Sequence, residues 1–120
     1  IFLSEDDNRR LYELGFEMVD PSNLSVKDQV RLFSSSSIVM GLHGAGFSNI
    51  IYANPLSLII ELVPYFYQDT PTGFLAQAVA ASWKRVLLRK IIFHSMAQLG
   101  AEEWQQIVSI INHWQATNGK

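Results

Sequence analysis

Apolar residues along the chain follow two alternating patterns, short continuous runs and helical spacing. The runs at 38–42 and 58–63 are almost wholly apolar and predict strands that are covered on both faces. Near the end of the chain, Trp104, Ile107 and Ile111 recur at helical spacing and predict a long amphipathic helix. The predicted helices begin near residues 4, 25, 47, 70 and 102, and the predicted strands cover residues 16–19, 38–42, 58–63 and 85–92.

Cap and turn residues support this division into elements. Ser4 precedes three acidic residues that favour a helix start, and Gly15 favours a helix end. Ser25 and Asp28 resemble a capping box, with Asp in place of the usual Glu. The alternation of helices and strands predicts an α/β domain. It has a mainly parallel sheet of about four strands with helices on both faces, because parallel neighbours need crossover connections.

Composition narrows the class of protein. The chain has 120 residues, which predicts a single domain over 1–120. Charged residues make up only 17% of it, so apolar surface is expected to meet a partner, a missing domain or another copy of the chain. A net charge of -2 argues against nucleic-acid binding. There is no cysteine, which excludes disulfides and thiolate metal sites, and no apolar run has the length of a membrane span.

The segment between the runs at 38–42 and 58–63 carries the candidate chemistry. It contains His43, Gly44, Ala45 and Gly46, followed by Asn49. Glycines at the start of a helix let backbone N–H groups approach an anion closely, and the helix N-terminus adds partial positive charge. The spacing is a poor match to the dinucleotide fingerprint or to a P-loop.

A wider sequence pattern is more specific to one protein family than this glycine-rich segment alone. It consists of Leu14 to Val19, Gln29 to Ser35, Gly41 to Asn49, and Ile59 to Leu62, and it resembles glycosyltransferase family 61. The resemblance implies the carboxy-terminal, Rossmann-like three-layer half of a two-domain GT-B enzyme. The chain is therefore expected to be a fragment that lacks an acceptor-binding domain and an arginine-bearing strand.

The resemblance also implies roles for individual residues. Such enzymes transfer a sugar from a nucleotide sugar, here expected to be UDP-linked, with inversion and without a metal or other cofactor. His43 is then the catalytic candidate at the leaving diphosphate. The donor-binding candidates are Gly44, Ala45, Gly46, Asn49 and Glu61. Glu61 is expected near a strand end, where its carboxylate can accept hydroxyl hydrogen bonds.

Other interpretations stay open. His43 can be a turn residue bonded to backbone, and Glu61 can be a structural partner in the sheet. His-Gly-Ala-Gly superficially resembles an esterase oxyanion loop, but the chain has no Gly-x-Ser-x-Gly nucleophile. A non-catalytic binding or interaction module is the main alternative. The expected location is cytoplasmic in a bacterium and the Golgi or endoplasmic reticulum lumen in a eukaryote.

Overall fold

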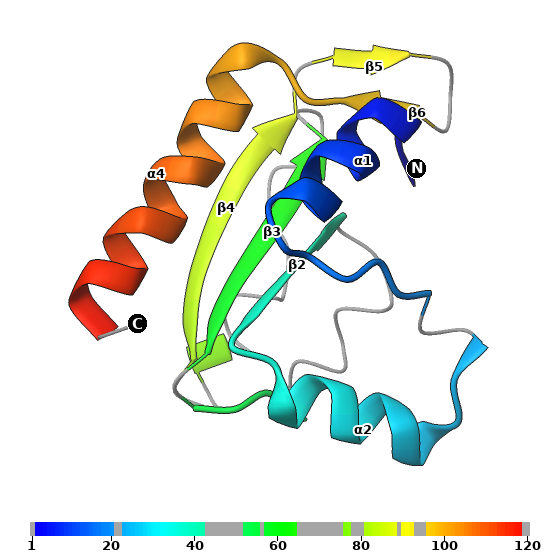
Figure 1. Ribbon diagram of the computed structural model, residues 1–120, viewed down its shortest axis with the longest axis vertical. Coiled ribbons are helices and arrows are strands. Elements are labelled where there is room, and N and C mark those ends of the chain that lie inside the picture. Colours follow the sequence, from blue (N-terminus) through cyan, green and yellow to red (C-terminus); the bar gives the residue numbers. More distant parts are fainter. Residues whose placement is uncertain are drawn as a thin grey trace.

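The protein has an α/β fold built on a parallel three-stranded sheet (Figure 1). The structure is a computed structural model. Its fold is compatible with the predicted Rossmann-like domain. The structure describes residues 2–20, 23–42, 52–55, 57–64, 76–77, 81–88, 90–92 and 96–118.

The main sheet has the order β2-β3-β4, with β3 in the middle. Its strands are β2 (Ile38–Leu42), β3 (Leu58–Pro64) and β4 (Ser82–Leu88). Every residue of β3 is buried, whereas every residue of β2 is only half-buried. Both apolar runs were predicted as strands, and both predictions are confirmed. The central strand, β3, pairs with both of the other strands.

A second, smaller sheet has the order β1-β6-β5. Its strands are β1 (Phe2–Leu3), β5 (Lys90–Ile92) and β6 (Met96–Gln98). The predicted strand at 85–92 is therefore divided between two sheets, because β4 ends at Leu88 and β5 pairs with β6 instead. Strands of two or three residues are too short to show a periodic pattern, so this sheet was not predicted.

Three helices lie among the described elements, α1 (Glu5–Glu13), α2 (Val26–Ser35) and α4 (Ala101–Asn118). The side chains of Ser4 and Ser25 accept hydrogen bonds from the N–H groups of Asp7 and Asp28, so both predicted caps are confirmed. Gly15 has a φ of 101° and follows the last turn of α1, which is the left-handed conformation that favours glycine.

Helices cover both faces of the sheet. One hydrophobic cluster joins even-numbered residues of β3 to α1 and α4, with Ile107 of α4 fully buried within it. A second cluster joins Ile59 of β3 to Phe33 of α2 and to Ala76. In Figure 1, α1 crosses in front of the sheet, α4 lies beside β4, and α2 lies below the sheet. The three-layer prediction is therefore confirmed.

The prediction of a strand at residues 16–19 is wrong. These residues follow α1 but belong to no strand. Phe16 packs against the core, whereas Met18 is 50% exposed and Val19 is 39% exposed. A short, mostly apolar segment does not make a strand on its own, because a strand also needs an edge to pair with. The helix predicted from Thr70 is described only at Ala76 and Gln77, and both of these residues are helical. The short helix predicted after Gly46 begins outside the described residues.

Candidate functional site

The candidate turn follows the carboxyl end of β2. His43, Gly44, Ala45, Gly46 and Asn49 lie outside the described residues, so their predicted roles stay predictions. β2 and β3 are parallel, and their carboxyl ends therefore meet at the same edge of the sheet. Ligands of open α/β sheets bind beyond this edge. The described part of the fold thus brings the chain to the turn at a place suited to a ligand.

Glu61 is the candidate that the structure describes in full. It is the fourth of seven residues in β3, and its exposed fraction is 0%. The expectation that Glu61 lies near the end of its own strand is therefore wrong, because β3 continues to Pro64. Glu61 is nevertheless level with Gly41, the residue before the last one in β2. Its carboxylate therefore lies at the level where β2 approaches the candidate turn.

Trp83 supplies a hydrogen-bond donor to this buried carboxylate. The indole Nε1–H of Trp83 donates to Oε1 of Glu61, with 3.2 Å between the two heavy atoms. A buried carboxylate is costly unless donors compensate for lost water, and this contact is one such compensation. The sequence did not single out Trp83, because its proximity to Glu61 depends on the register between β3 and β4.

The surroundings of Glu61 combine polar and apolar groups on one face of the sheet. Arg85 of β4 is paired in register with Glu61, and Ile59 is paired with Trp83. Trp83 also packs against the cluster that contains Phe33 of α2. Glu61 is covered in this conformation, so the structure supports its role as a structural partner within the sheet. Its predicted contact with ligand hydroxyl groups stays a prediction.

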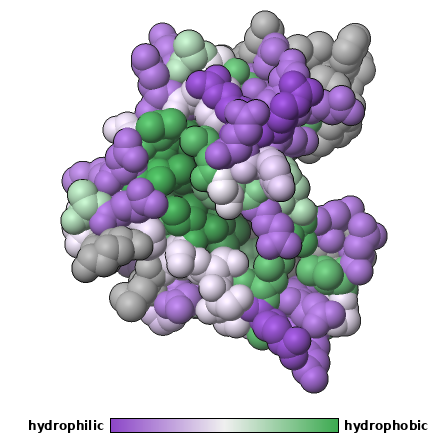
Figure 2. All heavy atoms as spheres, viewed as in Figure 1, coloured by the Kyte–Doolittle hydropathy of each residue, from purple (hydrophilic) through white to green (hydrophobic). Residues whose placement is uncertain are grey.

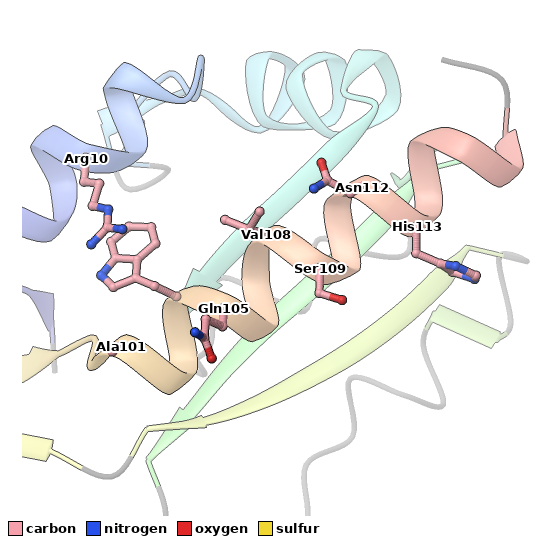
Figure 3. Close-up of a pocket in the computed structure, with 8 residues that line it drawn as sticks. Arg10, Ala101, Gln105, Val108, Ser109, Asn112 and His113 are labelled. Carbon is pink, nitrogen blue, oxygen red and sulfur yellow. The ribbon is translucent and has the colours of Figure 1, made fainter.

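A separate surface hollow runs along α4 (Figure 3). It has a volume of about 800 Å³ and one wall from α1. Its lining residues are Arg10, Ala101, Trp104, Gln105, Val108, Ser109, Asn112 and His113. The guanidinium of Arg10 lies 4.3 Å from the ring centroid of Trp104, which is only 4% exposed. Trp104 therefore packs in the core, and its ring contacts the guanidinium of Arg10. This agrees with its prediction as a core or interface residue.

Neither a metal centre nor a membrane helix occurs in the described part of the chain. Within residues 2–118, gaps excepted, no three His, Asp or Glu side chains gather where a metal ion could bind. The helices described in that part are also too short or too polar to cross a bilayer.

Comparison with known proteins relates part of the chain to glycosyltransferases. Residues 6–60 match the sequence model of Glycosyltransferase 61. Over 60 residues, the chain is 38% identical to a beta-1,2-xylosyltransferase of Arabidopsis thaliana, covering 48% of this chain and 11% of that protein. Over 56 residues, the chain is 39% identical to an alpha-1,3-arabinosyltransferase of Oryza sativa subsp. japonica, covering 44% of this chain and 10% of that protein.

A third relative is a beta-1,2-xylosyltransferase of Oryza sativa subsp. japonica, 30% identical over 47 residues, covering 39% of this chain and 9% of that protein. The matched stretches span about a tenth of the length of these relatives. No solved structure matches the chain at a significant level. The family match covers α1 from Asp6 onward, α2, β2, the candidate turn and the first three residues of β3. The resemblance to glycosyltransferase family 61 is thereby confirmed for residues 6–60.

Proposed function

We propose that the chain is the nucleotide-sugar-binding part of an inverting glycosyltransferase. The observation that carries the proposal is the position of the His-Gly-Ala-Gly sequence. It follows the carboxyl end of a parallel strand and lies inside the segment that matches the transferase family. In parallel α/β sheets this edge is where ligands bind. The relatives named above are glycosyltransferases, which favours a sugar donor over other anions.

The proposed chemistry is a single displacement at the anomeric carbon of the donor. An acceptor hydroxyl forms the new bond, the bond to the diphosphate breaks, and the nucleoside diphosphate leaves. A base, which we assign to a second domain, takes the hydroxyl proton. The amides of Gly44, Ala45 and Gly46 bind the diphosphate, and an N–H of His43 stabilises its developing charge. Backbone and imidazole donors supply this stabilisation without a metal ion.

Asn49 and Glu61 complete the proposed donor site. We assign Asn49 to the support of the turn, and Glu61 to the ribose or sugar hydroxyls. Because Glu61 is fully covered and bonded to Trp83, direct contact requires the residues above it to move when the donor binds. If they stay in place, Glu61 acts only as a support for the sheet beneath the site.

The donor is proposed to be a UDP-linked pentose, since the three relatives are named as xylosyl- and arabinosyltransferases. The acceptor is a glycan or a glycoprotein held by further domains. We propose a location in the Golgi or endoplasmic reticulum lumen, which was the expectation for a eukaryotic protein, because the relatives named above are plant proteins.

Calorimetric titration with UDP, UDP-xylose and UDP-arabinose tests the proposal on the longest available form of the protein. We expect His43→Ala to weaken UDP binding at least about tenfold, because it removes a charge-stabilising donor. His113→Ala is the matched control, because His113 is exposed on α4. This variant should bind UDP as tightly as the unchanged protein does. No binding heat at millimolar UDP-sugar, or equal loss in both variants, contradicts the proposal.

A non-catalytic interaction module is the second candidate, and one observation favours it. Figure 2 shows a hydrophobic hollow in the middle of one face. The apolar side chains that pack against the main core but are only partly buried are Phe16, Ile38, Met40, Leu42, Ile110, Ile111 and Trp114. Apolar surface of this kind is typical of a contact with another polypeptide. Light scattering after size-exclusion chromatography separates self-association from a monomer, and an oligomer that binds no UDP-sugar favours this candidate.

A further inference from the structure

The loop that leads into α2 carries a motif that the transferase proposal does not use. Asn23, Leu24 and Ser25 form an Asn-X-Ser triplet in which X is not proline. It is the single Asn-X-Ser/Thr triplet of the whole sequence. Such triplets are the acceptor sites of N-glycosylation in the eukaryotic secretory pathway. Because short motifs also arise by chance, the structural position of Asn23 decides whether the triplet suits a glycan.

The structure places Asn23 on the surface, next to backbone groups that are hydrogen-bonded. Asn23 is exposed, and its backbone N–H donates to the carbonyl of Asp20 at 3.1 Å. The carbonyl of Leu24 accepts a hydrogen bond from the side chain of Gln29, also at 3.1 Å. In Figure 1 this loop lies at the periphery, at the end of α2 that is remote from α4. A bulky group on Asn23 therefore needs no rearrangement of the core.

Ser25 has a separate role in the folded chain. Its backbone is extended, with φ −66° and ψ 161°, and its Oγ accepts the N–H of Asp28 at 3.1 Å as the N-cap of α2. Threonine and aspartate also cap helices, but of these two only threonine preserves the triplet. The helix cap and the glycan acceptor can therefore be separated by substitution at a single position.

We propose that Asn23 is an N-glycosylation site. This inference rests on the luminal location within the proposed function, but not on donor binding. The co-reactant is an oligosaccharide linked to a polyprenyl diphosphate. Nδ2 of Asn23 forms a bond to the anomeric carbon of that oligosaccharide and loses a proton, while the bond from this carbon to the diphosphate breaks and polyprenyl diphosphate leaves. The glycan then shields exposed apolar surface nearby in the chain, including Val26, which is 71% exposed.

The test uses the full-length protein in eukaryotic cells, with a reporter Asn-X-Thr triplet in a carboxy-terminal tag. A glycosidase that converts glycosylated Asn to Asp is applied in ¹⁸O-water, and peptide mass spectrometry measures the label at residue 23. We expect the label in the unchanged protein and in Ser25→Thr. We expect none in Asn23→Gln or in Ser25→Asp, although Ser25→Asp keeps the helix cap and should show the same circular dichroism.

Each outcome decides the question. Label in the reporter but not at Asn23 overturns the inference and leaves the transferase proposal intact. An unmodified reporter shows that the tagged end does not reach the lumen. The absence of label at Asn23 in the same sample then overturns the inference together with the proposed location. A labelled Asn23 in protein that binds no UDP-sugar confirms the site and contradicts only the donor-binding proposal.

Discussion

Asp7 is the residue whose truncation should most clearly destabilise the described fold. It lies in the first turn of α1 and is only 5% exposed. Its Oδ2 accepts the buried backbone N–H of Leu99 at 2.9 Å and the hydroxyl of Ser4 at 2.8 Å. The bond to Leu99 joins residues 92 positions apart. One carboxylate therefore ties the start of α1 to the segment that precedes α4.

The expected cost follows from these two contacts. Asp7→Ala leaves the Leu99 N–H buried without this acceptor, which costs about 1–3 kcal/mol, and the lost bond from Ser4 adds about 1 kcal/mol. We therefore expect the free energy of unfolding to fall by about 2–4 kcal/mol, a large share of the roughly 5–15 kcal/mol typical of small domains. Asp7→Asn keeps an acceptor oxygen, so its cost should be smaller.

Asp6→Ala is the matched control, because Asp6 is the neighbouring carboxylate in the same turn. Asp6 contacts Arg9 at 3.2 Å, but its side chain is 80% exposed, and such surface pairs contribute little. Urea unfolding followed by tryptophan fluorescence and circular dichroism measures all three variants. Equal stability of Asp7→Ala and Asp6→Ala would refute the reasoning, and so would unchanged hydrogen exchange at the Leu99 amide.

Two further substitutions probe the sheet and the helix ends. Trp83→Phe keeps an aromatic ring but removes the donor to Glu61, so urea unfolding should show a loss of about 1–3 kcal/mol, and a loss below about 0.5 kcal/mol contradicts a contribution from this bond. Gly15→Ala should lower the free energy of unfolding by about 1–2 kcal/mol, because a side chain is strained at the Gly15 φ of 101°. The space around Gly15 is open, so no steric clash adds to this cost. A cost near zero at Gly15 in the same assay would mean that α1 ends differently in solution.

Two strands of the main sheet, β2 and β3, were predictable because their apolar runs are continuous. The runs at 38–42 and 58–63 are too short for a typical helix and too apolar for a surface strand, and they form β2 and β3. The caps at Ser4 and Ser25 were predictable for a local reason, since a cap bonds within its own turn. Features decided by neighbouring residues in the sequence were thus the ones that sequence could specify.

Features decided by distant partners were not predictable in the same way. Residues 16–19 are mostly apolar and were predicted as a short strand, yet they pair with no described strand. The bond between Trp83 and Glu61 joins residues 22 positions apart, and the bond between Asp7 and Leu99 spans a still larger separation. The register of two strands and the docking of two helices set these contacts. The local sequence around each residue contains no information about strand register or helix docking.

The half-buried state of β2 leads to a last prediction about the donor site. β2 runs directly into the candidate turn, but its apolar side chains Ile38, Met40 and Leu42 are only partly covered. A strand whose residues are only partly covered is held less firmly than β3, and a looser strand gives the following turn more conformations to lose when a ligand binds.

Additional polypeptide that covers β2 in a longer form of the protein should therefore tighten donor binding. We expect UDP to bind the 120-residue chain at least about tenfold more weakly than that longer form, with slower hydrogen exchange at Met40 and Leu42 in the longer form. The comparison uses calorimetry and hydrogen exchange on both forms. Equal UDP affinity in the two forms would show that the turn is already fixed by β2 and β3 alone, and that the exposed apolar surface serves another contact.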